Sequence, residues 1–96
     1  MNSMGITIGK ATLGNEKVYI KLTRYQEPQN LCVYAVCESG EPYQRMTFNT
    51  EKKLSNPYSD AVFIRSWEVK EQMRKAMLDT GAFIPIKEIN HLYSKA

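Results

Sequence analysis

Few residues in this chain could carry out a reaction, and their spacing does not bring them together. His91 is the only histidine, and Cys32 and Cys37 are the only cysteines. A Cys–His pair could form an activated nucleophile, but nothing in the sequence places His91 beside either thiol. The cysteines lie five residues apart in one apolar stretch, so a strand would point them to opposite faces, unable to form a disulfide or share a metal ion. We predict buried structural cysteines, a surface histidine and no metal site, because zinc needs about four convergent ligands.

Carboxylates and glycines add no catalytic pattern. Glu38 and Glu41 flank a turn and Asp60 precedes a strand, where acidic residues commonly serve solubility. The five glycines are scattered and form no phosphate-binding loop. A catalytic pair of carboxylates has no support from spacing. The chain is therefore predicted to be non-enzymatic, without catalytic residues or a cofactor.

Another set of residues could bind rather than react. Two expected strands present tyrosine, threonine and basic residues on the side away from their apolar residues. Aromatic rings interleaved with cations on an open sheet can stack on bases and contact phosphates, and Tyr and Arg are also enriched in protein interfaces. An ordinary solvent-exposed sheet face explains the same pattern, because Tyr and Thr favour strands. The candidate binding face is Tyr19, Lys21, Thr23, Tyr43, Arg45 and Thr47, joined in some registers by Tyr34.

A hairpin is expected to position the first of these residues. Residues 6–13 and 16–25 flank Gly14 and Asn15, which suit a two-residue turn. The second arm alternates cleanly between apolar and polar residues, as a half-buried strand does. Gly9 predicts either a bulge or a close approach of another part of the backbone.

The next segments predict a second pair of strands and a long loop. Residues 31–37 are apolar on both faces, which is typical of a central strand. Pro42 suits the first position of the returning strand, in which Met46 and Phe48 are expected to face the core. The polar stretch 50–60 is long enough to be a functional or mobile loop, anchored by its one leucine, Leu54. Its candidate binding residues are Lys52, Lys53 and Tyr58.

A strand over 61–66 leads into the one expected helix. Ser66 can cap the start of this helix, and Gly81 can end it with a positive φ. The apolar positions follow helical spacing, which predicts one buried stripe: Val69, Met73, Ala76, Met77 and Thr80. We expect a structural clasp, a set of side chains that holds the sheet against the helix. If the indole of Trp67 is buried there, Trp67→Ala would lower the free energy of unfolding by several kcal/mol. The clasp residues are Phe63, Trp67, Met73 and Met77.

The end of the chain gives weaker patterns. The apolar stretch 82–86 predicts an edge strand with Pro85 facing solvent, and Ile86, Ile89 and Tyr93 have the spacing of a short helix. Strands first and a helix later predict an α+β fold with a mostly antiparallel sheet of five to six strands and the helix on one face. A chain of 96 residues is expected to form one domain, 1–96, with frayed tails at 1–5 and 94–96.

Composition narrows the classes of protein. The net charge of +3 is spread along the chain, whereas nucleic-acid binders usually concentrate their charge. No stretch approaches the ~18–20 apolar residues of a membrane-spanning helix, and the first residues lack the apolar core of a signal peptide. Two free thiols fit a reducing compartment. We expect a cytoplasmic protein that does not enter the membrane, whose start is either Met1 or Met4.

Two short motifs carry a family resemblance. The first runs from Glu38-Ser-Gly-Glu-Pro-Tyr43 to Met46-Thr-Phe-Asn49, and the second is Val62-Phe-Ile-Arg-Ser-Trp67. Together they resemble a family of small uncharacterised bacterial proteins carried on plasmids, conjugative elements and phages. Ser66 stands where that pattern has an acidic residue. The resemblance implies a mobile-element accessory protein, and it implies no activity and no catalytic residue.

Two functional hypotheses therefore stand. The first is a non-enzymatic accessory protein of a phage or mobile element that binds another protein, for example to inhibit a host defence system. The alternative is a small single-stranded nucleic-acid-binding protein that uses the tyrosine and basic sheet face. A homodimer is also open, because an exposed edge strand can pair across a two-fold axis.

Overall fold

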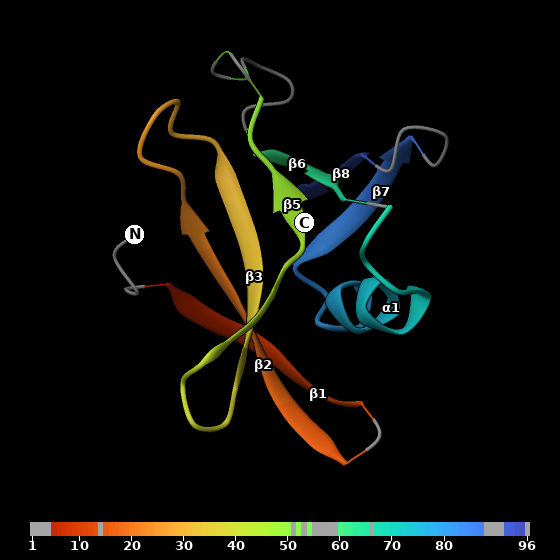
Figure 1. Cartoon of the computed structure of the whole chain (residues 1–96). Coiled ribbons are helices and arrows are strands. Elements are labelled where there is room, and N and C mark those ends of the chain that lie inside the picture. The colour runs from red at the N-terminus through yellow and green to blue at the C-terminus, as the bar shows by residue number, and fades with distance from the viewer. Residues whose placement is uncertain are drawn as a thin grey trace.

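Two antiparallel sheets and one helix make up the computed structural model, which describes residues 5–13, 15–50, 52, 54, 60–65, 67–87 and 92–95. Sheet A has the strand order β1-β2-β3-β4, and sheet B has the order β5-β6-β8-β7. The predicted α+β class is confirmed, whereas the prediction of one sheet of five to six strands is wrong (Figure 1). The elements are β1 (Ile6–Leu13), β2 (Glu16–Arg24), β3 (Leu31–Cys37), β4 (Pro42–Arg45), β5 (Thr47–Phe48), β6 (Ala61–Ile64), α1 (Glu71–Asp79), β7 (Phe83–Lys87) and β8 (Leu92–Lys95).

The predicted hairpin forms, and Gly9 has both of its expected roles. The pairing of β1 with β2 ends at Leu13 and Glu16, and its register shifts between Thr7 and Gly9. A Cβ atom added at Gly9 would lie 2.4 Å from Cγ2 of Thr80, the residue that follows α1. Glycine at this position therefore allows β1 to bulge and the end of the helix to approach its backbone.

Gly9→Ala is expected to lower the free energy of unfolding by about 1–3 kcal/mol, as overpacking usually does. The Thr80 side chain cannot turn away freely, because its hydroxyl donates to Met77 O (2.7 Å) and accepts from Ala82 N (3.1 Å). Thr80→Ser removes the clashing methyl group but keeps this hydroxyl, so the double variant should recover much of the loss. Urea unfolding of the four proteins measures the coupling, and purely additive losses would contradict the proposed clash.

One strand-like segment is shared by the two sheets, and it bends at Met46. The amide of Met46 donates to Val33 O in β3, and its carbonyl accepts from Arg65 N just after β6, both at 2.9 Å. Met46 is buried, as predicted, but so is Thr47, while Phe48 is 37% exposed. The chain leaves sheet A for sheet B at this point (Figure 1). The expected alternation of buried and exposed side chains fails here because both residues at the crossing are buried.

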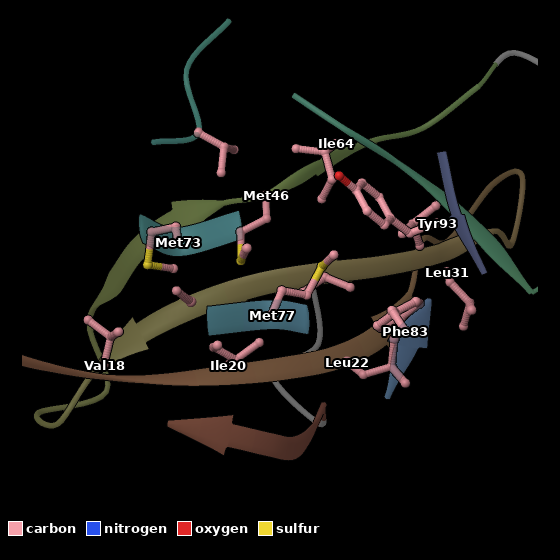
Figure 2. Packing of buried hydrophobic residues seen from close by; sticks show 14 residues of the cluster. Val18, Ile20, Leu22, Leu31, Met46, Ile64, Met73, Met77, Phe83 and Tyr93 are labelled. Atoms are coloured by element: carbon pink, nitrogen blue, oxygen red, sulfur yellow. The ribbon is translucent and has the colours of Figure 1, made fainter. Parts of the chain in front are cut away.

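The helix covers the inner face of sheet A, on the side of Val18 and Ile20 (Figure 2). Met73 and Met77 are fully buried in this core, which confirms the centre of the predicted stripe. Ala76 and Thr80 are half-buried, and Val69 is buried but precedes the helix. The helix is shorter than expected, since it begins at Glu71 after a turn over 67–69; the expected cap Ser66 lies outside the described residues.

Among the described residues, no helix is long and apolar enough to cross a membrane.

The two ends of α1 differ in how they meet the chain. Lys70 occupies the N-cap position without a side-chain hydrogen bond to the helix. At the other end, Gly81 has a φ of +77°, the left-handed conformation predicted for the residue that ends the helix.

The last strand corrects the prediction for the end of the chain. Residues 92–95 form β8, which lies between β6 and β7, so neither a short helix nor a frayed end at Ser94 and Lys95 is found. Ile89 and Ala96 lie outside the described residues. The hydrogen bonds that β8 makes along both of its edges outweigh the weak helical spacing of the sequence. The central position of β8 buries Tyr93. Its hydroxyl accepts a 3.0 Å bond from Nη1 of Arg74, which ties α1 to sheet B.

The strand β7 matches its prediction. It forms an edge of sheet B, and its Pro85 is exposed. A proline is tolerated at an edge because its missing N–H leaves no ladder hydrogen bond unmade on the solvent side.

Candidate binding surfaces

The two cysteines are not activated for catalysis. Cys32 pairs with Thr23 and Cys37 with Val18, which places the thiols on opposite faces of β3 as predicted. Burial raises the pKa of the Cys32 thiol, and the Glu16 carboxylate, 3.1 Å from Sγ of Cys37, raises the pKa of that thiol. Both thiols therefore stay protonated at neutral pH and are weak nucleophiles.

The remaining candidates for chemistry form no site in the structure as described. His91 lies outside the described residues. Within those residues no three or more His, Cys, Asp and Glu side chains lie close enough to hold a metal ion.

The outer face of sheet A, opposite the helix, gathers tyrosine and basic residues. Across the strands, Lys21 pairs with Tyr34 and Tyr34 with Arg45. In the next row Lys10 of β1 pairs with Tyr19. Strand pairing therefore brings together Tyr19, Lys21 and Arg45, as the sequence predicted, in one of the registers that also include Tyr34. We call this surface the basic face; its tyrosine and basic residues are Lys10, Lys17, Tyr19, Lys21, Tyr34, Tyr43 and Arg45.

Two of these residues were missed by sequence reasoning. Lys17 follows the same alternation as Tyr19 and Lys21, so extending that pattern by two residues would have found it. Lys10 could not be assigned to a face without knowing how the bulge at Gly9 shifts the register of β1. Both side chains are exposed.

Thr47 is not on the basic face, contrary to the prediction. It is fully buried, and its Oγ1 lies 3.0 Å from the hydroxyl of Tyr25 and 3.2 Å from the amide of Val33. Burial raises the pKa of Tyr25 to about 12, so this phenol stays protonated and donates to the Thr47 carbonyl (3.0 Å). Thr47 therefore supports the sheet rather than offering a binding surface. Thr23 does lie on the outer side of β2, as predicted, because it is two residues from Lys21 and pairs with Cys32; its side chain is half-buried.

A hollow of about 660 Å³ opens on the basic face along β3 and β4. Arg45 and Tyr34 belong to its lining, together with Pro42 and Glu27. The Tyr34 hydroxyl is buried and has no hydrogen-bond partner among the described residues; Gly5 lies against it, where an added Cβ would be 2.6 Å away. The other lining residues are Tyr25, Gln26, Cys32, Ala35, Val36, Gly40, Gln44 and Asn49.

A second surface is formed by aromatic residues on sheet B. The ring centroids of Phe48 and Phe63 are 5.5 Å apart, and those of Phe48 and Trp67 are 5.6 Å apart. The guanidinium carbon of Arg65 lies 5.7 Å from the centre of the Trp67 ring, and Arg65 also pairs with Glu68 at 2.9 Å. We call Phe48, Phe63, Arg65 and Trp67 the aromatic cluster.

The expected clasp is correct for its methionines and wrong for its tryptophan. Trp67 is 65% exposed, whereas Val69, two residues later, reaches the core. The reason is the late start of the helix, which leaves Trp67 in a turn instead of the first helical turn. Phe63 alternates with the buried Val62 and Ile64, so strand alternation could have placed its ring outside the core.

The predicted binding loop is described only in part. Lys52 is exposed, while Lys53 and Tyr58 lie outside the described residues. Asn30, 3% exposed, holds this loop: its Nδ2 donates to Asn49 Oδ1 (2.9 Å), Thr50 Oγ1 (3.0 Å) and the Lys52 carbonyl (3.2 Å). Its Oδ1 accepts from the amide of the predicted anchor, Leu54, at 2.8 Å.

Comparison with known proteins gives no relative for this arrangement. No protein-family model matches the chain, and no curated protein and no solved structure matches it.

Proposed function

We propose that this chain is a non-enzymatic accessory protein of a phage or mobile element that acts by binding another protein through the aromatic cluster. The exposure of Trp67 is the observation that carries the proposal. An indole that lies 65% in solvent adds little to the core, and tryptophan and arginine are, with tyrosine, the residues enriched among binding hot spots.

The geometry of the cluster favours binding. The Trp67 ring packs against Phe48, and the guanidinium of Arg65 lies over the Trp67 ring while it is paired with Glu68. A side chain ordered before binding loses less conformational entropy when a partner covers it. The partner expected here is a protein that offers an apolar pocket for the indole ring.

The mobile-element context is supported by the family resemblance alone. The second of the two resembling motifs, 62–67, contains three of the four residues of the cluster: Phe63, Arg65 and Trp67. The raised pKa values of the two thiols favour a binding role over nucleophilic catalysis. Inhibition of a host defence protein by occlusion of its surface is the form of binding that fits this context.

Trp67→Ala is expected to abolish capture of the partner while costing only about 1 kcal/mol of stability. The small cost follows from losing one aromatic contact and one exposed cation–π contact. Tyr43→Ala, which removes another exposed ring from sheet A, serves as the matched control. Capture from a bacterial host lysate with the three proteins, followed by calorimetry with the purified partner, measures the effect.

The two variants separate the outcomes. A partner held by the wild type and by Tyr43→Ala, but at least about 30-fold weaker with Trp67→Ala, supports the proposal. Sedimentation of the chain alone is measured in parallel, because self-association lost in Trp67→Ala would make the partner a second copy. A Trp67→Ala variant that is destabilised by 3 kcal/mol or more would instead assign the indole a structural role.

A further inference from the structure

We infer that the basic face is a separate binding surface for single-stranded nucleic acid. This inference does not rest on the aromatic cluster, which lies on sheet B. It rests on the charge of the face, on the way strand pairing interleaves cations with tyrosine rings, and on the hollow beside them.

The cations of the basic face are not neutralised. Lys10, Lys17, Lys21 and Arg45 make no ion pair with any described residue, since the ion pairs found there belong to Arg24, Arg65 and Arg74. The described strand residues that face this way include no carboxylate. These four positive charges on one side of a small sheet outnumber the one carboxylic acid residue that lines the hollow there, Glu27, and they attract a polyanion.

Strand pairing places rings between these charges. Tyr34 lies between Lys21 and Arg45 across the sheet, and Tyr19 is paired with Lys10. Neighbouring strands are about 4.8 Å apart, so the two cations that flank Tyr34 are on the order of 10 Å apart. A strand of nucleic acid crossing the face would meet phosphate-binding groups and stacking surfaces in turn.

The hollow decides between a nucleic acid and an acidic protein. Its volume of about 660 Å³ is within the range of ligand pockets and has room for one unstacked base with its sugar. Arg45 belongs to its lining, where it can meet the phosphate of that nucleotide, and Tyr34 and Pro42 supply apolar walls. Glu27 also lines the hollow and offers an acceptor for the amino group of a base. An acidic protein surface would use the charges but would have no need of the hollow.

Fluorescence anisotropy with labelled oligo-dT and oligo-rU of roughly 12 nucleotides tests the inference. Affinity should fall about 50-fold between 50 and 200 mM salt if four phosphates are contacted. Lys21→Gln and Arg45→Gln should each weaken binding and reduce the slope of log affinity against log salt by about 0.7. Lys75→Gln removes the same charge from the exposed side of α1 and should change neither.

The ring contribution is tested separately from the charge. Tyr19→Ala should weaken binding by roughly 5- to 150-fold, the effect of losing one stacked base, whereas Tyr19→Phe keeps the ring and should bind as the wild type does. Binding of either the DNA or the RNA strand supports the inference, and the tighter one identifies the natural strand. Trp67→Ala should leave this affinity unchanged, so failure here is distinguishable from failure of the proposed protein binding.

Three results would overturn the inference. The first is no binding of either strand at 50 mM salt. The second is an equal loss of affinity in Lys21→Gln, Arg45→Gln and Lys75→Gln, which would show that the net charge of the protein alone attracts the nucleic acid. The third is full competition by polyglutamate combined with no effect of Tyr19→Ala, which would assign the face to an acidic protein.

Discussion

Met77→Ala is expected to lower the free energy of unfolding by about 2–5 kcal/mol, the usual cost of removing a large side chain from a core. Met77 is fully buried on the face of α1 that packs against Val18 and Ile20 of sheet A, near Phe83 of sheet B (Figure 2). Its removal would leave a cavity where the helix and both sheets meet. Neighbouring side chains can fill such a cavity only in part, because each is already fixed by its own contacts.

Two companion variants make this result specific. Met77→Leu nearly conserves volume and should cost less than about 1.5 kcal/mol. Gln72→Ala changes an exposed position of the same helix and should stay within about 0.5 kcal/mol of the wild type. Urea unfolding gives the change in unfolding free energy for all three variants, with a common slope of free energy against urea concentration. A Met77→Ala loss below 1 kcal/mol would mean that α1 does not close the core as the structure shows.

Asn30→Ala is expected to cost about 2–4 kcal/mol, which is unusual for a polar side chain. The amide group of Asn30 satisfies Leu54 N and donates to groups on Asn49, Thr50 and Lys52. Alanine would leave the part-buried amide N–H of Leu54 without this acceptor and would free Asn49, Thr50 and Lys52 from their bonds to Asn30. The amides of these four residues should also show faster hydrogen exchange than those of the strands around them.

Controls for Asn30 use the same network. Lys52 contributes its backbone carbonyl, so Lys52→Ala removes only an exposed side chain and should be close to neutral. Asn30→Asp can still accept from Leu54 N but cannot donate, so it should fall between the wild type and alanine. Equal stability of Asn30→Ala and Lys52→Ala, measured by thermal unfolding, would contradict the role assigned to this network.

Features encoded by a few neighbouring residues were predictable from the sequence. The β1–β2 hairpin, the bulge at Gly9, Pro42 at the start of β4, the Met73 and Met77 stripe and the turn at Gly81 are all found. Each of these features depends on the backbone φ that a residue allows, on the spacing of apolar residues along the chain, or on one close contact. Most of the basic face was found in the same way, because strand alternation needs no knowledge of distant partners.

Features that depend on distant partners were not predictable. The division into two sheets is decided at Met46, where bonds to Val33 and Arg65 come from opposite directions along the chain. The role of Asn30 could not be predicted from the sequence, because the groups that it binds lie about 20 residues later. Trp67 was expected in the clasp because the strand was predicted to lead directly into a helix capped by Ser66, and only the later start of α1 shows that Val69 reaches the core in its place.

The central position of β8 governs the order in which the protein can assemble during translation. Sheet A is built from residues 6–45, mostly through hairpins, so its strands can pair as soon as they leave the ribosome. Sheet B must wait for its completion, because β6, which can already pair with β5, is joined to β7 only through residues 92–95. Until then one edge of β6 is open and β7 has no partner strand, so the nascent chain exposes apolar surface. The core is completed last, when Tyr93 arrives at Arg74.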